Sequence, residues 1–121
     1  MKTIIYNRVQ SFNYAIAGMR WAFSRHVNYR IHAAISILVV VAGLYFNLAR
    51  LDWLLLIITI ALGFVIETIN TAIEATLDAV DKTKRDDIKI AKDVSAAAML
   101  IYSIGAIIVA LIIFYPYLTI E

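Results

Sequence analysis

Three carboxylates and one amide recur at helical spacing within an otherwise apolar stretch of the chain. They are Glu67, Asn70, Glu74 and Asp78, separated by three, four and four residues. On an α-helix, at ~100° per residue, the three carboxylates lie within an arc of about 40° on one face. Two acids stacked on one face repel each other, which a divalent cation or a proton on Glu67 relieves. The spacing therefore predicts a metal or proton site along this face.

Two further groups of polar residues are of the types that hold phosphates or metals. Lys92 and Asp93 begin the last uncharged run of the chain. Beside carboxylates, a lysine can steady phosphate oxygens, although a snorkelling lysine followed by a helix-start aspartate explains the pair equally well. His26 and His32 flank Arg30, and each is either a ligand or a hydrogen-bonded interfacial histidine.

The composition excludes several other kinds of site. The chain has no cysteine, which excludes disulfides, zinc fingers and thiolate catalysis. Its four glycines are isolated, so neither a P-loop nor a GxGxxG turn can form. The formal net charge of +2 is too small to indicate nucleic-acid binding. A bound phosphate must therefore be held by side chains or by a metal.

The elements that carry these residues are predicted to be membrane helices. Of the 121 residues, 63% are apolar and the mean hydropathy is +0.82, more than a soluble domain of this size can bury. Because ~20 apolar residues cross ~30 Å of hydrocarbon as a helix, we expect an all-α membrane protein with spans at about 31–49, 52–77 and 93–118. Measured from Trp53 at the outer interface, Glu67 lies about 21 Å deeper and Glu74 about 32 Å.

The residues before the first span have the pattern of an amphipathic helix over about 3–28. Apolar residues with arginines between them recur there at spacings of three and four: Ile5, Val9, Phe12, Ile16, Met19 and Phe23. This pattern suits a helix on the cytoplasmic surface, and equally a stripe packed on the other helices. Basic residues are concentrated before the first span and between the second and third, with only Arg50 in the first connection. The N-terminus and second loop are therefore expected in the cytoplasm.

The twelve residues 67–78 (ETINTAIEATLD) resemble the ExxNTAIExxxD signature of the small prokaryotic membrane lipid kinases, the diacylglycerol kinase and undecaprenol kinase family. Segments 11–15 (SFNYA), 28–32 (NYRIH) and 91–93 (AKD) also match. The resemblance covers nearly the whole chain, taken as a single domain of residues 1–121. It implies a homotrimer in the bacterial inner membrane, with active sites between subunits that use Mg²⁺ and ATP to phosphorylate a lipid hydroxyl.

The resemblance also implies roles for individual residues. Glu67 is then the catalytic base and Glu74 a metal ligand. His26 stands where the family usually has a second metal-binding glutamate, and imidazole is a poor ligand for Mg²⁺. The expected nucleotide-binding residues are Tyr14, Asn70, Glu74, Asp78, Lys84, Arg85, Lys92 and Asp93, of which Lys84 and Arg85 belong to a loop that departs from the usual Glu-Tyr-His. The lipid substrate is expected at Arg20, Arg30 and Glu67.

The segment Arg30-Ile31-His32 resembles the undecaprenol kinase branch more than the diacylglycerol kinase branch, and this resemblance implies undecaprenol as the favoured acceptor. Three alternatives remain open from the residues alone. The first is a diacylglycerol kinase that makes phosphatidic acid. The second is a catalytically silent descendant of the family, which His26 suggests. The third belongs to another functional class: a small proton-coupled transporter in which Glu67 is the titrating acid and no nucleotide is bound.

Overall fold

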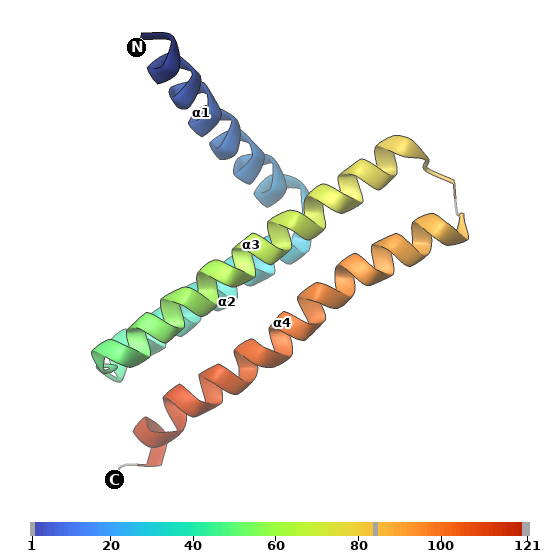
Figure 1. Cartoon of the computed structure of the whole chain (residues 1–121). Coiled ribbons are helices and arrows are strands. Elements are labelled where there is room, and N and C mark those ends of the chain that lie inside the picture. The colour runs from blue at the N-terminus through green and yellow to red at the C-terminus, as the bar shows by residue number, and fades with distance from the viewer. Residues whose placement is uncertain (1, 84, 120–121) are drawn as a thin grey trace.

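The computed structural model describes residues 2–83 and 85–119, which form four α-helices. They are α1 (Lys2–Arg25), α2 (Val27–Tyr45), α3 (Arg50–Val80) and α4 (Asp86–Thr119). Helix α3 packs against both α2 and α4, whereas α2 and α4 have no backbone packing with each other (Figure 1). Helices α2, α3 and α4 are long and apolar enough to cross a membrane. The expected all-α membrane architecture with three spans is confirmed.

The junction between α1 and α2 lies earlier than the sequence pattern predicts. The expected surface helix ran to about residue 28 and the first span began at about 31, but α1 ends at Arg25 and α2 begins at Val27. His26 separates them in an extended conformation, with φ −107° and ψ 120°. Neither Gly nor Pro marks this break, so the apolar pattern alone could not place it.

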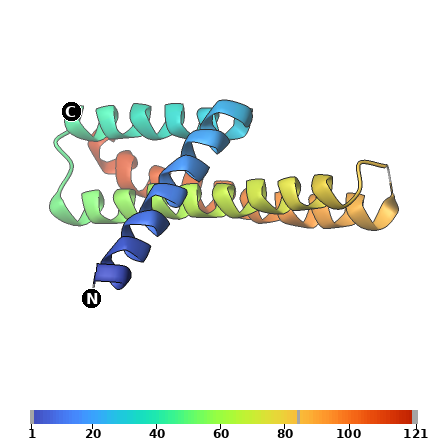
Figure 2. The same ribbon diagram turned by 90° about the horizontal axis from the view of Figure 1, so that it is seen from above.

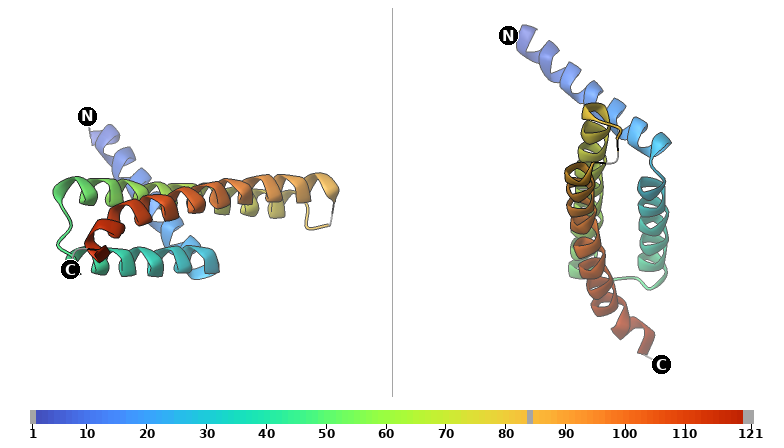
Figure 3. Two further views of the ribbon diagram at one scale, coloured as in Figure 1. Left: turned by 90° about the horizontal axis from the view of Figure 1, so that it is seen from below. Right: turned by 90° about the vertical axis from the view of Figure 1, so that its right-hand side faces the viewer.

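Helix α1 leaves the other three helices obliquely (Figures 2 and 3). Ala22, near its C-terminal end, is buried, but Phe12, Met19 and Phe23 of the apolar stripe are exposed. The side chain of Ile5 lies outside the described part of the structure. These exposed members of the stripe are therefore not buried by the other helices of the same chain.

The turn between α2 and α3 begins at Phe46, inside the range expected for the first span. Helix α2 ends at Tyr45 instead of residue 49. Asn47 adopts a left-handed conformation with φ 51°, and the Leu48 N–H donates to the Gly43 carbonyl at 3.1 Å. This is the hydrogen-bond pattern of a Schellman cap, in which a residue that tolerates φ > 0 closes the helix. The cap also buries Leu48 against the core.

Helices α3 and α4 are longer than the spans expected at 52–77 and 93–118. They contain 31 and 34 residues, which corresponds to lengths of about 46 and 51 Å. Helix α4 begins at Asp86, two turns before the predicted start, because Asp86 and Asp87 occupy its first turn, where carboxylates complement the helix dipole. The hairpin of α3 and α4 therefore continues past the N-terminal end of α2, next to which α1 ends (Figure 3).

The core lies at the opposite end of the molecule. Leu48, Leu56 and Ile113 are buried there, with Trp53 and other aromatic rings packed around them. The Tyr117 hydroxyl donates to Asp52 at 2.7 Å and accepts from the Ala49 N–H at 2.9 Å. This end ties α3, α4 and the α2–α3 turn together.

Candidate active site

The polar stripe of α3 passes from a buried to a water-accessible environment. Glu67 is 1% exposed, and Asn70 is also buried. The side chain of Glu74 is 34% exposed and that of Asp78 is 54% exposed. The helix therefore carries one set of polar groups from membrane depth to the surface, as their three- and four-residue spacing predicted.

Glu67 has no hydrogen-bond partner for its Oε2 atom among the described residues. An unpaired polar atom at membrane depth is costly, because neither water nor lipid tails can satisfy it. Such a carboxylate oxygen is free to accept the proton of an incoming hydroxyl group.

An open groove of about 640 Å³ lies between the end of α1 and the helices α2 and α3. It is lined by Met19, Arg20, Phe23, Tyr29, Ala61 and Phe64. Phe64 lies one turn before Glu67 on α3. Arg20 thus lines an apolar groove whose wall reaches Phe64, one turn from Glu67, whereas Arg30 is exposed and is not among the residues that line the groove.

Glu74 faces the junction between α1 and α2. Its Oε2 atom lies 3.8 Å from Nδ1 of His26, whose ring lies against Trp21 with a centroid separation of 5.3 Å. In the described part of the chain, no three His, Asp or Glu side chains gather closely enough to hold a metal ion. A single accessible carboxylate does fit Mg²⁺ that arrives with a nucleotide, since this ion is usually held by one or two carboxylates together with substrate phosphates.

Polar bonds join α3 to α4 on either side of this level. Ser95 Oγ donates to Asn70 Oδ1 at 2.6 Å, in a buried position. Nearer the surface, Lys92 Nζ donates to Asp78 Oδ1, also at 2.6 Å. Of the expected binding residues, Asp78 and Lys92 are thus brought together, and Asn70 lies two turns away along α3 with Ser95 as its partner. Asp93 instead accepts a bond of 2.6 Å from Lys89 on its own helix.

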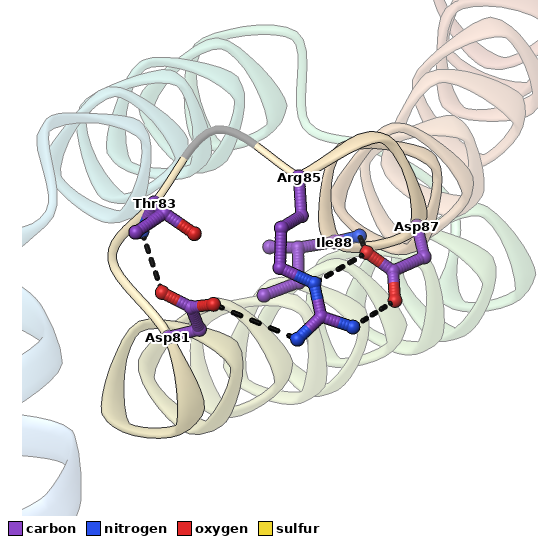
Figure 4. Close-up of polar contacts among 5 residues, drawn as sticks. All are labelled: Asp81, Thr83, Arg85, Asp87 and Ile88. Carbon is purple, nitrogen blue, oxygen red and sulfur yellow. Dashed lines mark hydrogen bonds and ion pairs between the residues drawn. The ribbon is translucent and has the colours of Figure 1, made fainter.

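Arg85 is held by two aspartates at the tip of the α3–α4 hairpin (Figure 4). Its guanidinium donates to Asp87 at 2.6 and 3.1 Å and lies 3.6 Å from Asp81. The bonds to Asp87 raise the pKa of Arg85. The Thr83 N–H donates to Asp81 at 2.8 Å and lowers the pKa of that carboxyl group. Arg85 must exchange these partners if it is to contact a nucleotide.

One of the expected nucleotide-binding residues, Tyr14, is not brought to the stripe. Tyr14 is 71% exposed on α1, and no hydrogen bond or ring contact joins it to the carboxylates within the described residues. Lys84 lies outside the described residues.

Sequence reasoning missed Ser95 as a partner of Asn70, and it missed the unpaired hydroxyl of Thr71, which is buried on α3. The sequence contained only part of the information needed to find these two residues. Thr71 lies inside the twelve-residue motif, and Ser95 lies three residues after Lys92, on the same side of α4.

Comparison with known proteins identifies the family. The model of the prokaryotic diacylglycerol kinase family matches residues 13–114. The chain belongs to that family. It is 36% identical over 104 residues to a diacylglycerol kinase of Synechocystis sp., which covers 85% of this chain and 59% of that protein. This chain therefore spans less than two thirds of the length of that relative.

Other members of the prokaryotic diacylglycerol kinase family match over most of their length. An undecaprenol kinase of Bacillus subtilis is 33% identical over 108 residues, 88% of this chain and 87% of that protein. A diacylglycerol kinase of Escherichia coli K12 is 29% identical over 100 residues, 83% and 82% respectively. The family predicted from the twelve-residue motif is confirmed, and it includes relatives named for two different lipid acceptors.

Proposed function

We propose that this protein is an ATP-dependent lipid kinase, which transfers the γ-phosphate of MgATP to the hydroxyl of a membrane lipid and prefers undecaprenol to diacylglycerol. The observation that carries the proposal is Glu67, a carboxylate 1% exposed with one unpartnered oxygen, on the same helix face as the accessible Glu74. The preference for undecaprenol rests on the segment Arg30-Ile31-His32, and a diacylglycerol kinase that makes phosphatidic acid is the alternative.

Transfer needs one base and a well-positioned phosphate. The lipid hydroxyl oxygen attacks the γ-phosphorus, the bond to the bridging oxygen of ADP breaks, and Glu67 Oε2 accepts the hydroxyl proton. Most of the barrier to phosphoryl transfer is removed by positioning and by neutralising charge. The groove lined by Arg20 offers the lipid a route from the bilayer. Its apolar walls can contact a hydrocarbon chain, and the guanidinium group of Arg20 can bind a polar headgroup.

The remaining polar residues suit the nucleotide. Glu74 would hold Mg²⁺, which neutralises phosphate charge when bound; His26 would be at most a weak second ligand. Lys92 exchanges Asp78 for a phosphate oxygen, and Asn70 and Asp78 line the same side of α3. Tyr14, Lys84, Arg85 and Asp93 are proposed as outer contacts of the nucleotide, and Arg30 as a second contact of the lipid headgroup.

Two features favour a kinase over a proton-coupled transporter. No ionisable residue occurs between Trp53 and Ile66, so α3 offers no relay of acids from Glu67 to the far side of the membrane. Asp52, at that far end, is bonded to Tyr117. The acids instead continue from Glu67 in one direction, toward the end of the molecule where α1 departs.

We also propose that the protein acts as a homotrimer in the bacterial inner membrane, with its N-terminus in the cytoplasm. Large apolar side chains of α4 such as Ile101, Ile108 and Leu111 are exposed along the helix, and a neighbouring copy or lipid must cover them. A trimer predicts a mass in detergent three times the 13.6 kDa of one chain.

The function is tested by assaying labelled phosphate transfer from ATP to undecaprenol and to a diacylglycerol in mixed micelles. Because a general base contributes roughly 10² to 10⁴ in rate, Glu67→Gln is expected to lower kcat by at least 100-fold. Asp86→Asn, a carboxylate neutralised at an exposed position of α4, is the matched control and should stay within about twofold of the parent, as a surface change does. Undiminished transfer by Glu67→Gln would refute the assigned base.

A further inference from the structure

Three buried side-chain atoms have no hydrogen-bond partner among the described residues, and all three lie along one face of α3. They are His32 Nε2, Glu67 Oε2 and Thr71 Oγ1. Glu67 and Thr71 are four residues apart, and His32 lies over Gly63, four residues before Glu67. Positions four residues apart are one above the other on a helix. Gly63, Glu67 and Thr71 therefore form a row on three successive turns of α3, and His32 lies over the first of them.

His32 reaches this row only because residue 63 is glycine. A Cβ at Gly63 would overlap the imidazole of His32 and the hydroxyl of Tyr102. The Tyr102 hydroxyl is fixed there by donating to the Thr59 carbonyl at 2.6 Å, and the imidazole meets the Phe64 ring edge-on with centroids 4.6 Å apart. The imidazole is thus held on α3 by packing, while its Nε2 atom has hydrogen-bonding capacity to spare.

A cavity of about 230 Å³ adjoins His32 on the side away from Glu67. It lies among α2, α3 and α4, with His32, Ser36, Thr59 and Tyr102 in its wall and apolar side chains such as Val39 and Leu56 deeper in the membrane. A ligand that carries oxygen at one end and hydrocarbon at the other matches this order of polar and apolar walls.

We propose that His32 is a positioning residue for the acceptor lipid: its Nε2–H donates a hydrogen bond to the hydroxyl oxygen whose proton faces Glu67, and the adjoining cavity receives the carbon atoms next to that hydroxyl. This inference rests on the proposed lipid kinase function. It requires the imidazole tautomer that carries its proton on Nε2.

The spacing suits one oxygen atom between the two groups. Gly63, over which His32 lies, and Glu67 are about 6 Å apart along the helix axis. A hydroxyl oxygen with one hydrogen bond of about 2.8 Å on each side spans nearly this distance. An alcohol donates one bond and accepts another, so it satisfies both atoms at once.

The test measures lipid and ATP kinetics separately on the purified full-length protein, with undecaprenol in mixed micelles as the varied lipid. His32→Ala removes one hydrogen bond to the acceptor, so we expect kcat/KM for the lipid to fall about tenfold while KM for ATP stays within twofold. His32→Gln keeps an N–H donor and should recover part of the loss. Ala106→Leu fills the cavity and should lower kcat/KM for the lipid while His32 is intact.

Two glycine variants distinguish the effect of the position of the His32 ring from the effect of the imidazole group itself. Gly63→Ala keeps His32 but displaces its ring, and should reproduce the His32→Ala kinetics. Gly105→Ala is the matched control, because a Cβ at Gly105 meets no atom within 4 Å, and it should leave lipid kinetics unchanged.

Three results would overturn the inference. One is a lipid kcat/KM within twofold of the parent in His32→Ala. Another is an equal loss for lipid and ATP together with a lower melting temperature, because this indicates a purely structural role. If the parent phosphorylates no lipid alcohol, the proposed function fails and the inference with it; if Glu67→Gln is inactive and His32→Ala is normal, only the inference fails.

Discussion

Asp81 and Arg85 organise the α3–α4 connection through charge. Their side chains form an ion pair of 3.6 Å. Asp81 accepts the backbone N–H of Thr83 at 2.8 Å, a local turn that aspartate forms readily. This bond favours the charged carboxylate and lowers the pKa of Asp81. Arg85 adds its bonds to Asp87, which gives the start of α4 a second charged contact.

The lowered pKa of Asp81 sets the pH dependence of this connection. A carboxyl group whose folded pKa is depressed stabilises the folded state fully above its unfolded value, ordinarily ~3.9, and loses that contribution as the pH falls through the folded value. The Thr83 amide signal, followed by NMR in micelles, should therefore titrate below the ordinary aspartate range. Asp81→Asn, which keeps the acceptor oxygen, should abolish the titration; a midpoint at or above the ordinary value would contradict the assignment.

The polar stripe of α3 could be predicted residue by residue, because a helix converts spacing directly into a shared face. The partners across the helices could not. The bond from Ser95 to Asn70 and the contact of His32 with Gly63 depend on how α4 and α2 lie against α3, and spacing within one helix carries no information on that. An isolated glycine in an apolar run likewise gives no sign of which ring will occupy the space above it.

Helix ends were the least predictable feature at the scale of elements. Hydrophobicity marks where hydrocarbon must surround the chain, whereas a helix ends where its hydrogen bonds are capped. Residues 46–49 are as apolar as the helix before them, apart from Asn47, yet they form the turn. At the other extreme, α4 extends beyond its apolar part to Asp86, because carboxylates stabilise the N-terminal end of a helix.

Asn47 is expected to determine the stability of the α2–α3 turn. Its φ of 51° suits glycine and asparagine, whereas a β-branched side chain in this region costs ~1–2 kcal/mol. Asn47→Val should therefore lower the free energy of unfolding by about that amount, while Asn47→Gly stays close to the parent. Denaturant unfolding in micelles measures both. Equal stabilities would argue against the left-handed turn, and kcat should be unchanged in both because the turn lies at the end opposite Glu74.

At the scale of the whole molecule, the end where α1 departs carries the site and the opposite end carries the core. Glu74 and Asp78 lie where α3 extends past α2, beside the α1–α2 junction, and Leu48, Leu56 and Ile113 pack at the far end. The number of spans and the class of the fold were predictable because three apolar runs dominate the composition. The oblique course of α1 was not, since it depends on the break at His26.

The orientation in the membrane can be tested directly because the chain has no cysteine of its own. Lys82→Cys and Arg50→Cys each introduce one thiol at an exposed position, at opposite ends of α3. If the basic loop faces the cytoplasm, a membrane-impermeant maleimide added to intact spheroplasts should label Arg50→Cys at once and Lys82→Cys only after permeabilisation. The reverse pattern would place the nucleotide-binding end outside the cell and contradict the proposed function.

The unequal lengths of the spans have a consequence for the setting in which the protein works. Helix α2, with 19 residues, is about 28 Å long, close to the thickness of the hydrocarbon layer, whereas α3 and α4 exceed it. Helix α2 is therefore the span whose length matches the hydrocarbon layer. A host bilayer of shorter or longer acyl chains must tilt this helix or deform around it, which would change the depth of Glu67 on the neighbouring α3. If Glu67 is the base proposed above, we expect the rate of phosphate transfer to change with membrane thickness.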